Sequence, residues 1–435
     1  MAQDDTRGFG GLKVDVENFA FSFLRARVKV LNYMRTFQIL KSLDWRVKVI
    51  LIIQGIYNFS YSFVSPYNVL FAHALGATGT DIGLMLALSA LVMAISSPMV
   101  GLAIERFSIK KIIVFGITCD IVALTVFALA TDWWVLIPAF VLYYQLIRQM
   151  PLADLLIVTF TELNIRGTVM GLSRILWGGA IVLGPLMAAT LVNYYGELRP
   201  LYYIAIPITI SALIMAHLGL SDFLISGDRK VLSSPKKRGD IFFEYKSFLK
   251  EGHIGKWIVI RFFKDGQLYL LMTFIPLWVV GVKGAAPTTW GALSSISSLS
   301  AMLAQVPAGN LSDKIGRKKA FFLFTSFYCL GIITLISSPS TELLFLAAIL
   351  GMGMGGIGGA AFTPFITLWW EAVPAESRGK LYGLEGIVSA PSRIPFMLIG
   401  GALWDWGFKA HVLVLPVIVE VLIVIPILST IPEKR

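Results

Sequence analysis

Residues 309–318 read Gly309-Asn310-Leu311-Ser312-Asp313-Lys314-Ile315-Gly316-Arg317-Lys318 and follow a long apolar segment. A weaker copy lies 208 residues earlier, as Gly101-Leu102-Ala103-Ile104-Glu105-Arg106-Phe107-Ser108-Ile109-Lys110. In both copies an acidic residue comes four positions after the first glycine, and basic residues follow. A repeated polar turn between apolar segments indicates that the chain consists of two related halves.

The composition around these turns is that of a membrane protein. Of the 435 residues, 56% are hydrophobic and only 14% are charged, and the mean hydropathy is +0.76. Soluble domains carry about 25% charged residues, and a helix needs about 20 apolar residues to cross a bilayer. We therefore predict an all-α integral membrane protein. The 12 expected transmembrane helices cover residues 48–72, 81–104, 111–131, 133–160, 168–193, 200–222, 257–282, 288–311, 319–338, 342–370, 380–403 and 410–430.

The predicted helices fall into two groups of six. The polar stretch 223–256 separates them, and matching residues recur at offsets of 208–212 positions, as in Gly83 and Gly291 or Arg166 and Arg378. An even number of helices per group places both groups the same way up, as in a parallel duplication. The predicted regions are a cytoplasmic basic amphipathic tail (1–46), an N-terminal six-helix bundle (47–222), a cytoplasmic central loop (223–256) and a C-terminal six-helix bundle (257–431).

The basic residues predict the orientation in the membrane. The net charge is +11. With both termini in the cytoplasm, twelve Lys and Arg residues fall in short inner loops and at the C-terminus, and only Arg199, Lys283 and Lys409 fall in outer loops. This is the positive-inside bias, so the basic excess does not indicate a nucleic-acid partner. Residues 18–41 contain no acid. They form an amphipathic helix on the inner leaflet or only reinforce the topology, and both interpretations stay open.

Residues for cofactor chemistry are scarce. Cys119 and Cys329 lie in apolar spans, and the four histidines lie apart and outside span centres, which argues against metal, haem or disulfide chemistry. No Gly-x-x-x-x-Gly-Lys-Ser/Thr loop exists in the sequence, which argues against an ATP-driven pump. We expect no cofactor and no enzyme activity, and we expect a monomeric protein of the cell membrane.

The repeated turns resemble those of the major facilitator superfamily, and the resemblance extends over about residues 45–430. The turn at 309–318 matches the family's Gly-x-x-x-Asp-Arg/Lys-x-Gly-Arg-Arg/Lys signature in full, whereas the copy at 101–110 has Glu105 for the acid and Ser108 for the second glycine. Since glycine adopts a left-handed turn without steric cost, Ser108 departs from the expected turn. The resemblance implies two six-helix bundles with pseudo-two-fold symmetry that move a small organic solute by alternating access.

By the same resemblance, the two turns form a gate on the cytoplasmic side. Asp313 should approach the start of the fifth helix and Glu105 the start of the eleventh, where the helix dipole and free N–H groups stabilise a carboxylate. The alternative is that these are ordinary hydrophilic turns. The predicted gate residues are Gly101, Glu105, Arg106, Arg166, Gly309, Asp313, Gly316, Arg317 and Arg378.

Ten ionisable residues lie within predicted spans, where a charge costs at least about 2.5–3.5 kcal/mol and should face a cavity or a partner. Arg148 and Arg393 lie about midway along the fourth and eleventh helices, where an arginine can bind an anionic substrate group, hold an acid or form a structural ion pair. The predicted substrate-binding residues are Asn58, Tyr61, Tyr144, Gln145, Arg148, Gln267, Tyr269 and Arg393.

A second group of charges points to proton coupling. The predicted proton-coupling residues are Asp154, Asp265 and Glu385, and Arg261 lies one helical turn before Asp265, at the spacing of a local ion pair. Asp120 and Glu420, in the third and twelfth helices, are expected to have structural roles. The tenth span contains six glycines between 351 and 359, which indicate close packing, bending, or both.

These observations favour a proton-coupled secondary transporter, with a small-molecule substrate, protons and membrane lipid as partners. A proton-coupled multidrug or organic-anion exporter, an uncoupled facilitator or lipid flippase, and a receptor that has lost transport remain alternatives. A degenerate copy of the antiporter signature of drug exporters favours export. Its residues are Gly171, Ala180, Gly184, Pro185, Ala188 and Ala189. The identity of the substrate stays open.

Overall fold

Helices make up all the regular secondary structure in the part of the chain that the structure describes. The computed structural model describes residues 43–144, 154, 156–157, 160–162, 165–220, 253–353, 355–373 and 378–433, with side chains described for all of these except 97–106 and 378–387. The predicted tail and central loop lie almost entirely outside these residues.

The N-terminal half begins with a first span in two parts, α2 and α3, joined by a 3₁₀ turn at Pro66. Proline is tolerated there because the first turn of a helix leaves N–H groups without intrahelical partners. The elements of this half are α2 (Trp45–Val64), η1 (Ser65–Tyr67), α3 (Asn68–Ala74), α4 (Gly79–Arg106), α5 (Ile109–Leu129), η2 (Trp133–Val135), α6 (Leu136–Tyr143), α9 (Arg166–Tyr195) and α10 (Arg199–Gly219).

The C-terminal half repeats this arrangement with two π-helical segments, η3 and η6, in its seventh and twelfth spans. Its elements are α13 (Ile254–Leu277), η3 (Trp278–Val282), α14 (Pro287–Ile315), α15 (Arg317–Ser337), α16 (Thr341–Leu350), η4 (Ile357–Ala361), α17 (Phe362–Glu371), α18 (Arg378–Asp405), α19 (Lys409–Val419), η6 (Glu420–Val424) and α20 (Ile425–Ser429).

Most of these helices have the length and composition of membrane spans. Among the described residues, eight are long and apolar enough to cross a bilayer. Helices α14 and α18, which correspond to the predicted eighth and eleventh spans, are not among these eight because they are more polar. They have 29 and 28 residues and are therefore long enough to cross. Apart from the tenth span, the described helices follow the predicted spans closely, and the protein is an all-α membrane protein of the predicted class.

The two copies of the signature turn differ in conformation. Gly316 has a φ of +95° and separates α14 from α15, so glycine is needed there. Ser108 instead has a φ of −64°, and its hydroxyl accepts a hydrogen bond from the N–H of Lys111 at 3.4 Å. Serine therefore serves as the N-cap of α5, and the left-handed turn expected from the signature is absent at Ser108.

The tenth span differs from the single helix predicted over 342–370. Helix α16 ends at Leu350, and the chain resumes a helical course only at η4. Gly353 and Gly356 have φ values of +67° and +68°, which an ordinary α-helix does not allow. The N–H of Gly356 donates to the carbonyl oxygen of Ser297 in α14, at 2.7 Å. The prediction of a continuous helix was wrong, because the chain unwinds here and brings Gly355 against Ser297 of α14 and Gly351 against Tyr328 of α15.

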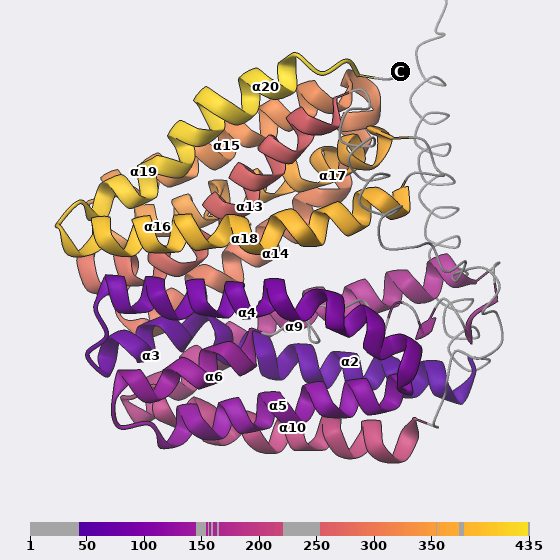
Figure 1. The fold of residues 1–435 in the computed structure, drawn as a ribbon. Helices are drawn as coiled ribbons and strands as arrows, with labels where there is room; N and C mark the ends of the chain where they lie inside the picture. Colours follow the sequence, from indigo (N-terminus) through magenta and orange to yellow (C-terminus); the bar gives the residue numbers. More distant parts are fainter. Residues whose placement is uncertain are drawn as a thin grey trace, which may run out of the picture.

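Two pairs of helices join the halves. Figure 1 shows the N-terminal half (indigo to magenta) beside the C-terminal half (orange to yellow), with α4 next to α18 at their boundary. Helix α9 packs on α14 across the same boundary. Because the duplication relates the second helix to the eighth and the fifth to the eleventh, the two pairs are equivalent. This equivalence is the pseudo-two-fold symmetry expected of the fold.

Close packing inside the N-terminal half predicts a stability effect at Gly184 of α9. A Cβ atom there would lie 2.8 Å from the backbone nitrogen of Phe63 in the first span. Overpacking typically costs about 1–3 kcal/mol, so we expect Gly184→Val to lower the thermal unfolding temperature of purified protein by several degrees. Gly179→Val in the same helix is the control, since nothing lies within 4 Å of its Cβ position. Equal unfolding temperatures for both variants would contradict this packing.

Candidate functional site

One end of the boundary between the halves is closed by a carboxylate. Asp405, the last residue of α18, accepts hydrogen bonds from the N–H groups of Gly79 and Thr80 at the start of α4, both at 2.7 Å. The first N–H groups of a helix have no intrahelical partners and attract negative charge. Thr78 and Asp81 complete the cap within α4 through the hydrogen bond from Thr78 N to Asp81, at 2.9 Å. We call this contact the Asp405 clamp.

Glycines let the backbones of the two halves touch beside the clamp. A Cβ atom on Gly83 of α4 would collide with the carbonyl oxygen of Met397, and one on Gly401 would lie 2.9 Å from the Cα of Thr80. The same arrangement recurs in the equivalent pair, where a Cβ on Gly291 of α14 would lie 2.7 Å from the carbonyl oxygen of Pro185 in α9. The sequence marked Gly83 and Gly291 as a repeated pair, and the structure places both at helix crossings between the halves.

Two aromatic side chains close the second crossing. The indole N–H of Trp290 donates to the carbonyl oxygen of Pro66 across the boundary, at 2.8 Å. The hydroxyl of Tyr67 donates to Pro185, at 3.3 Å, within the N-terminal half. All of these contacts lie at the end that the charge distribution predicts to be outside the cell. We call it the predicted outer end.

The opposite, predicted cytoplasmic end is not joined in this way. Asp313 is exposed, and nothing lies within 4 Å of a Cβ atom on Gly167 or Gly171 at the start of α9. Among the described side chains, no hydrogen bond or ion pair connects the halves at this end. The contact expected between Asp313 and the fifth helix is therefore not formed in this structure. A Cβ atom on Gly309 would lie 3.9 Å from the side chain of Thr363, in its own half.

Arg317 is held inside the C-terminal half. Its guanidinium pairs with Glu371 at 2.7 Å, and its backbone N–H donates to the carboxylate of Glu433 at 2.6 Å. Arg166 donates to the carbonyl oxygen of Thr161, at 3.3 Å. Glu371 and Glu433 were not predicted as gate residues. The side chains of the other predicted gate residues, Gly101, Glu105, Arg106 and Arg378, lie outside those that the structure describes.

A buried arginine lies midway along the boundary. The guanidinium of Arg393 in α18 lies 3.6 Å from the ring centroid of Tyr269 in α13. Its Nη1 donates to the sulfur of Met93 in α4 at 3.4 Å, and its Nη2 to the hydroxyl of Ser389 at 3.3 Å. Arg393 is only 8% exposed. It therefore contacts both halves with its charge almost fully removed from solvent.

Aromatic residues of both halves gather near this arginine. Tyr269 lies close enough to Arg393, Tyr61 and Asp265 to interact with each electrostatically. Tyr61 in turn stacks on Tyr143, with ring centroids 5.6 Å apart, and Tyr144 packs edge-on against Tyr143 at 5.3 Å. The structure thus brings together Tyr61, Tyr144, Tyr269 and Arg393, four of the predicted substrate-binding residues.

The other predicted substrate-binding residues are placed differently. The amide of Asn58 donates to the backbone carbonyl of Gln54 in its own helix, at 2.8 Å. Gln267 is 2% exposed and donates to Glu420, so it lies inside the C-terminal half and not at the boundary. Gln145 and Arg148 lie outside the described residues.

Two ion pairs fill the interior of the C-terminal half. Asp265 pairs with Arg261 at 3.2 Å, the one-turn contact that the sequence predicts. Lys264 pairs with Glu420 of η6 at 3.0 Å, and Glu420 is fully buried. Lys264 also lies 5.1 Å from the ring centroid of Phe321. The contacts of Glu420 with Lys264 and Gln267 join the seventh and twelfth spans, which fits the structural role expected for it.

A small cavity of about 80 Å³ lies between α13, α15 and the unwound part of the tenth span. Asp265, Thr325 and Gly353 are among the residues that line it. Gln267 Oε1 and Thr325 Oγ1 are buried there without a hydrogen-bond partner among the described atoms. A cavity of this size has room for about two water molecules, which would give Asp265 a polar surrounding inside the bundle.

The remaining predicted proton-coupling residues can be placed only in part. Asp154 pairs with Arg174 of α9 at 2.6 Å, and the side chain of Arg174 is 58% exposed. The side chain of Glu385 lies outside those described. Within the described residues, no group of three or more His, Cys, Asp or Glu side chains is arranged to hold a metal ion.

Comparisons with known proteins agree with this architecture. The model of the Major Facilitator Superfamily matches residues 50–394 and 257–434. The chain belongs to the Major Facilitator Superfamily, a family of membrane transporters. It is 21% identical over 381 residues to the multidrug resistance protein MdtG of Escherichia fergusonii, covering 86% of this chain and 92% of that relative. It is 23% identical over 351 residues to multidrug resistance protein 2 of Bacillus subtilis, covering 79% and 84%.

Solved structures show the same fold at low sequence identity. A mutant of the nucleoside transporter NupG has a TM-score of 0.72 at 12% identity, covering 89% of this chain and 99% of that one. A bacterial homologue of the iron transporter ferroportin, in an inward-facing state, has a TM-score of 0.67 at 12% identity, covering 88% and 98%.

The clamp has a pH dependence that follows from its hydrogen bonds. Asp405 lies two residues beyond the predicted span 380–403. Partial burial raises its pKa, but hydrogen bonds from Thr80, Gly79 and Thr78 together lower it by more, so the net pKa is below the ordinary value. The closed end therefore favours the charged form of the Asp405 carboxylate. The clamp stabilises that end above the ordinary carboxyl pKa, and this contribution is lost as the pH falls through the lowered pKa.

We expect Asp405→Asn to shift the population toward an open predicted outer end by about two- to fivefold, the effect of a carboxylate at a helix terminus. Spin labels on the exposed residues Glu197 and Ser340, with Cys119 and Cys329 replaced by serine, would report this as longer distances in pulsed electron resonance. Acidic pH should lengthen the distances in the parent but not further in the variant. Asp132→Asn is the control, because Asp132 accepts its hydrogen bond from the neighbouring Thr131. Unchanged distances in Asp405→Asn would contradict the clamp.

Proposed function

We propose that this transporter is a proton-coupled exporter of amphipathic organic molecules that carry an anionic group. The observation that carries the proposal is Arg393, buried at the boundary of the halves and stacked on Tyr269. The curated relatives named above are multidrug resistance proteins, which supports export of drug-like molecules. The proposed protein is a monomer of the cell membrane with both termini in the cytoplasm.

The surroundings of Arg393 favour an anionic ligand. Its guanidinium contacts a ring, a thioether and a hydroxyl, and no carboxylate pairs with it among the described side chains. A buried charge without a partner of opposite sign is costly, so such residues mark substrate pathways in membrane proteins. Arginine has five donors and never loses its proton. A carboxylate, phosphonate or similar group of the substrate would complete the site.

The aromatic residues would hold the body of the substrate. Tyr269 offers a ring face beside the guanidinium, and the stacked pair Tyr61 and Tyr143 lies on the N-terminal side. Ring faces beside a few polar groups suit amphipathic molecules of varied shape. Since Tyr61 and Tyr269 come from different halves, the substrate would contact both halves and respond to their movement.

Proton coupling is assigned to Asp265. Its carboxylate is paired with Arg261 and lines the polar cavity in the C-terminal half. Because arginine cannot release a proton, the carboxylate is the member of this pair that can carry one. Protonation would break the pair with Arg261, and Tyr269 lies near enough to interact electrostatically with both Asp265 and Arg393. Asp154, paired with Arg174, is a second proposed coupling residue, and Glu385 a third.

The closed predicted outer end fits a carrier that loads substrate from the cytoplasm. In the opposite state, we propose that Asp313 moves to the start of α9 and Glu105 to the start of α18, and that the Asp405 clamp opens. Both contacts use the same physics, because each places a carboxylate at a helix terminus of the other half. The halves would therefore exchange one clamp for another.

The substrate site predicts a loss of binding in Arg393→Gln. A thermal-shift screen of purified protein against organic anions, amphipathic cations and sugars should give its largest shifts with amphipathic anions. Hydrogen bonds to a charged group contribute about 1.5–3 kcal/mol, so the variant should bind such an anion about 10- to 100-fold more weakly. Arg199→Gln is the control, since Arg199 also lies over a ring, that of Phe71, but within the N-terminal half. Undiminished binding by Arg393→Gln would contradict the proposed site.

The coupling role predicts that Asp265→Asn separates transport from proton movement. In proteoliposomes with a pH dye inside, the parent should move protons when substrate is added. Asp265→Asn should retain exchange of labelled for unlabelled substrate and lose most of the proton signal. If the parent moves substrate without any proton signal, the protein is an uncoupled facilitator. If the variant keeps the full signal, another residue carries the proton.

A further inference from the structure

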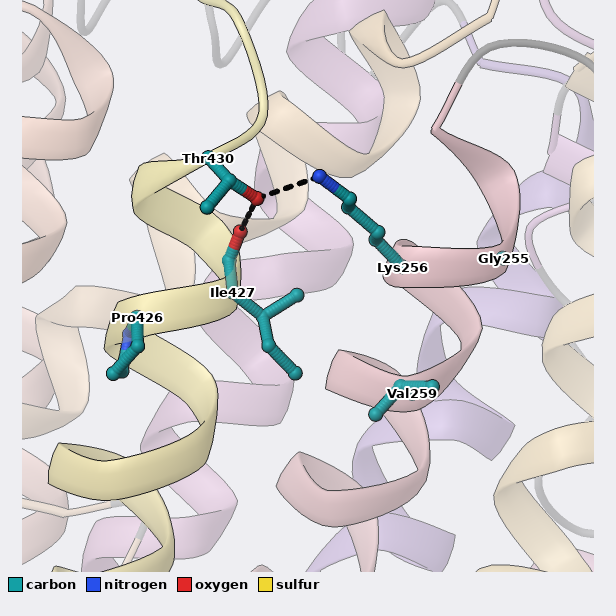
Figure 2. A pocket seen from close by; sticks show the side chains of 6 residues that line it. All are labelled: Gly255, Lys256, Val259, Pro426, Ile427 and Thr430. Carbon is teal, nitrogen blue, oxygen red and sulfur yellow. Dashed lines mark hydrogen bonds between the residues drawn. The ribbon is translucent and has the colours of Figure 1, made fainter.

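A groove on the surface of the C-terminal half takes no part in the mechanism proposed above. It lies between the start of α13 and the end of α20, and has a volume of about 500 Å³. Figure 2 shows the residues that line it, which are Gly255, Lys256, Val259, Pro426, Ile427 and Thr430. Pockets that hold small molecules have volumes of about 300–1,000 Å³, so the groove is large enough to hold part of a ligand.

The sequence explains why the two helices leave this space. Gly255 has no side chain, and nothing lies within 4 Å of its Cβ position. On the opposite wall, α20 begins with Ile425 and Pro426 directly after the π-helical segment η6. Val259 stays 40% exposed beside the groove. The walls are therefore mostly apolar and open to the surroundings of the helix bundle.

One end of the groove is positively charged. The ammonium group of Lys256 donates to the hydroxyl of Thr430 at 2.8 Å, and that hydroxyl donates to the carbonyl of Ile427 (Figure 2). No carboxylate pairs with Lys256 among the described residues. Since an ammonium has three donors, two stay available for a ligand. Lys318 of α15 donates to the carbonyl oxygens of Ser429, at 3.2 Å, and of Ile431, just beyond the end of α20.

The charges near this end are mostly basic. Among the described acids, Glu433 is the closest to Thr430 along the chain, and its carboxylate already accepts a hydrogen bond from the backbone N–H of Arg317 at 2.6 Å. An incoming anion would thus meet Lys256 with its partner Thr430, whereas Lys318 already donates to two backbone carbonyls and lies near Glu433. Charge complementarity therefore favours an anion over a cation or a neutral group at the end of this groove.

Polarity changes along the groove in the direction expected for a lipid. Lys256 lies in the first turn of α13, at the predicted cytoplasmic end, whereas Val259 lies about 4.5 Å further into the bilayer at 1.5 Å per residue. Pro426 and Ile427 likewise precede Thr430 along α20. The charged end would be level with lipid headgroups, and the apolar walls level with acyl chains.

We propose that this groove binds an anionic phospholipid of the cytoplasmic leaflet. Its phosphate would contact Lys256 and Thr430, and an acyl chain would lie along Val259, Pro426 and Ile427. Basic residues at a membrane surface attract anionic lipids, and the apolar walls would hold one lipid in a defined place. This site is separate from the boundary between the halves, so it does not depend on the substrate proposal.

Native mass spectrometry of delipidated full-length protein can test the site with phosphatidylglycerol and phosphatidylcholine of equal chain length. We expect the first phosphatidylglycerol to bind about fivefold more tightly than phosphatidylcholine, the contribution of one lysine near a membrane surface. Lys256→Gln should remove this preference. Gly255→Leu should weaken phosphatidylglycerol binding while the lysine remains, because the new side chain would occupy the groove. Inorganic phosphate should not displace the lipid.

Matched controls lie at the opposite end of the same half. Lys409→Gln removes a lysine that lies near Trp404, and Gly281→Leu adds a side chain where nothing lies within 4 Å. Both should bind phosphatidylglycerol as the parent does. Equal binding of the two lipids by the parent, displacement by inorganic phosphate, or unchanged binding in both Lys256→Gln and Gly255→Leu would overturn the proposal. If another segment of the chain occupied the groove, phosphatidylglycerol binding would be unchanged in both Lys256→Gln and Gly255→Leu.

Discussion

Backbone contact between α4 and α18 is the constraint on which the rest of the structure depends. The carboxylate of Asp405 binds the first N–H groups of α4, and Gly83 lets the two helices touch without side chains between them. Such contact is possible only where the crossing helices carry glycines, here Gly83 and Gly401, and where the first N–H groups of α4 find an acceptor. It draws the two halves together at one end, whereas no hydrogen bond or ion pair between described side chains joins them at the opposite end.

The duplication repeats this constraint and thereby positions the site. Helices α9 and α14 cross at Gly291 as α4 and α18 do at Gly83, so the halves meet along two equivalent lines. Arg393 lies on one of these helices, midway between the closed predicted outer end and the predicted cytoplasmic end. A movement that opened the clamp would change the surroundings of Arg393, Tyr61 and Tyr269 together. The geometry that closes one end is therefore also the geometry that couples the substrate to the movement.

Sequence reasoning succeeded where the physics is local or repeated. Helix lengths, the Arg261–Asp265 pair one turn apart and the equivalence of the two halves all follow from spacing along the chain. The Asp405 clamp joins residues 326 positions apart, and no local pattern shows which acid reaches a distant helix terminus. Gln267 and Tyr269 are two positions apart and so point to opposite sides of α13. Depth in the membrane alone could not show that only Tyr269 faces the boundary. The glycines of the tenth span predicted close packing, bending, or both, but they did not show that the helix unwinds where Gly355 and Gly356 contact α14.

The most direct measurement of this account is transport by a protein whose clamp cannot open. Cysteines at positions 80 and 405 would stand where the backbone N–H of Thr80 and the carboxylate of Asp405 lie 2.7 Å apart across the halves. Oxidation or a short bifunctional reagent can bridge them in proteoliposomes. If the halves must separate here in each cycle, bridging stops substrate flux and reduction restores it. Flux at the unbridged rate in fully bridged protein would show that the solute crosses without this movement, and the account would be wrong.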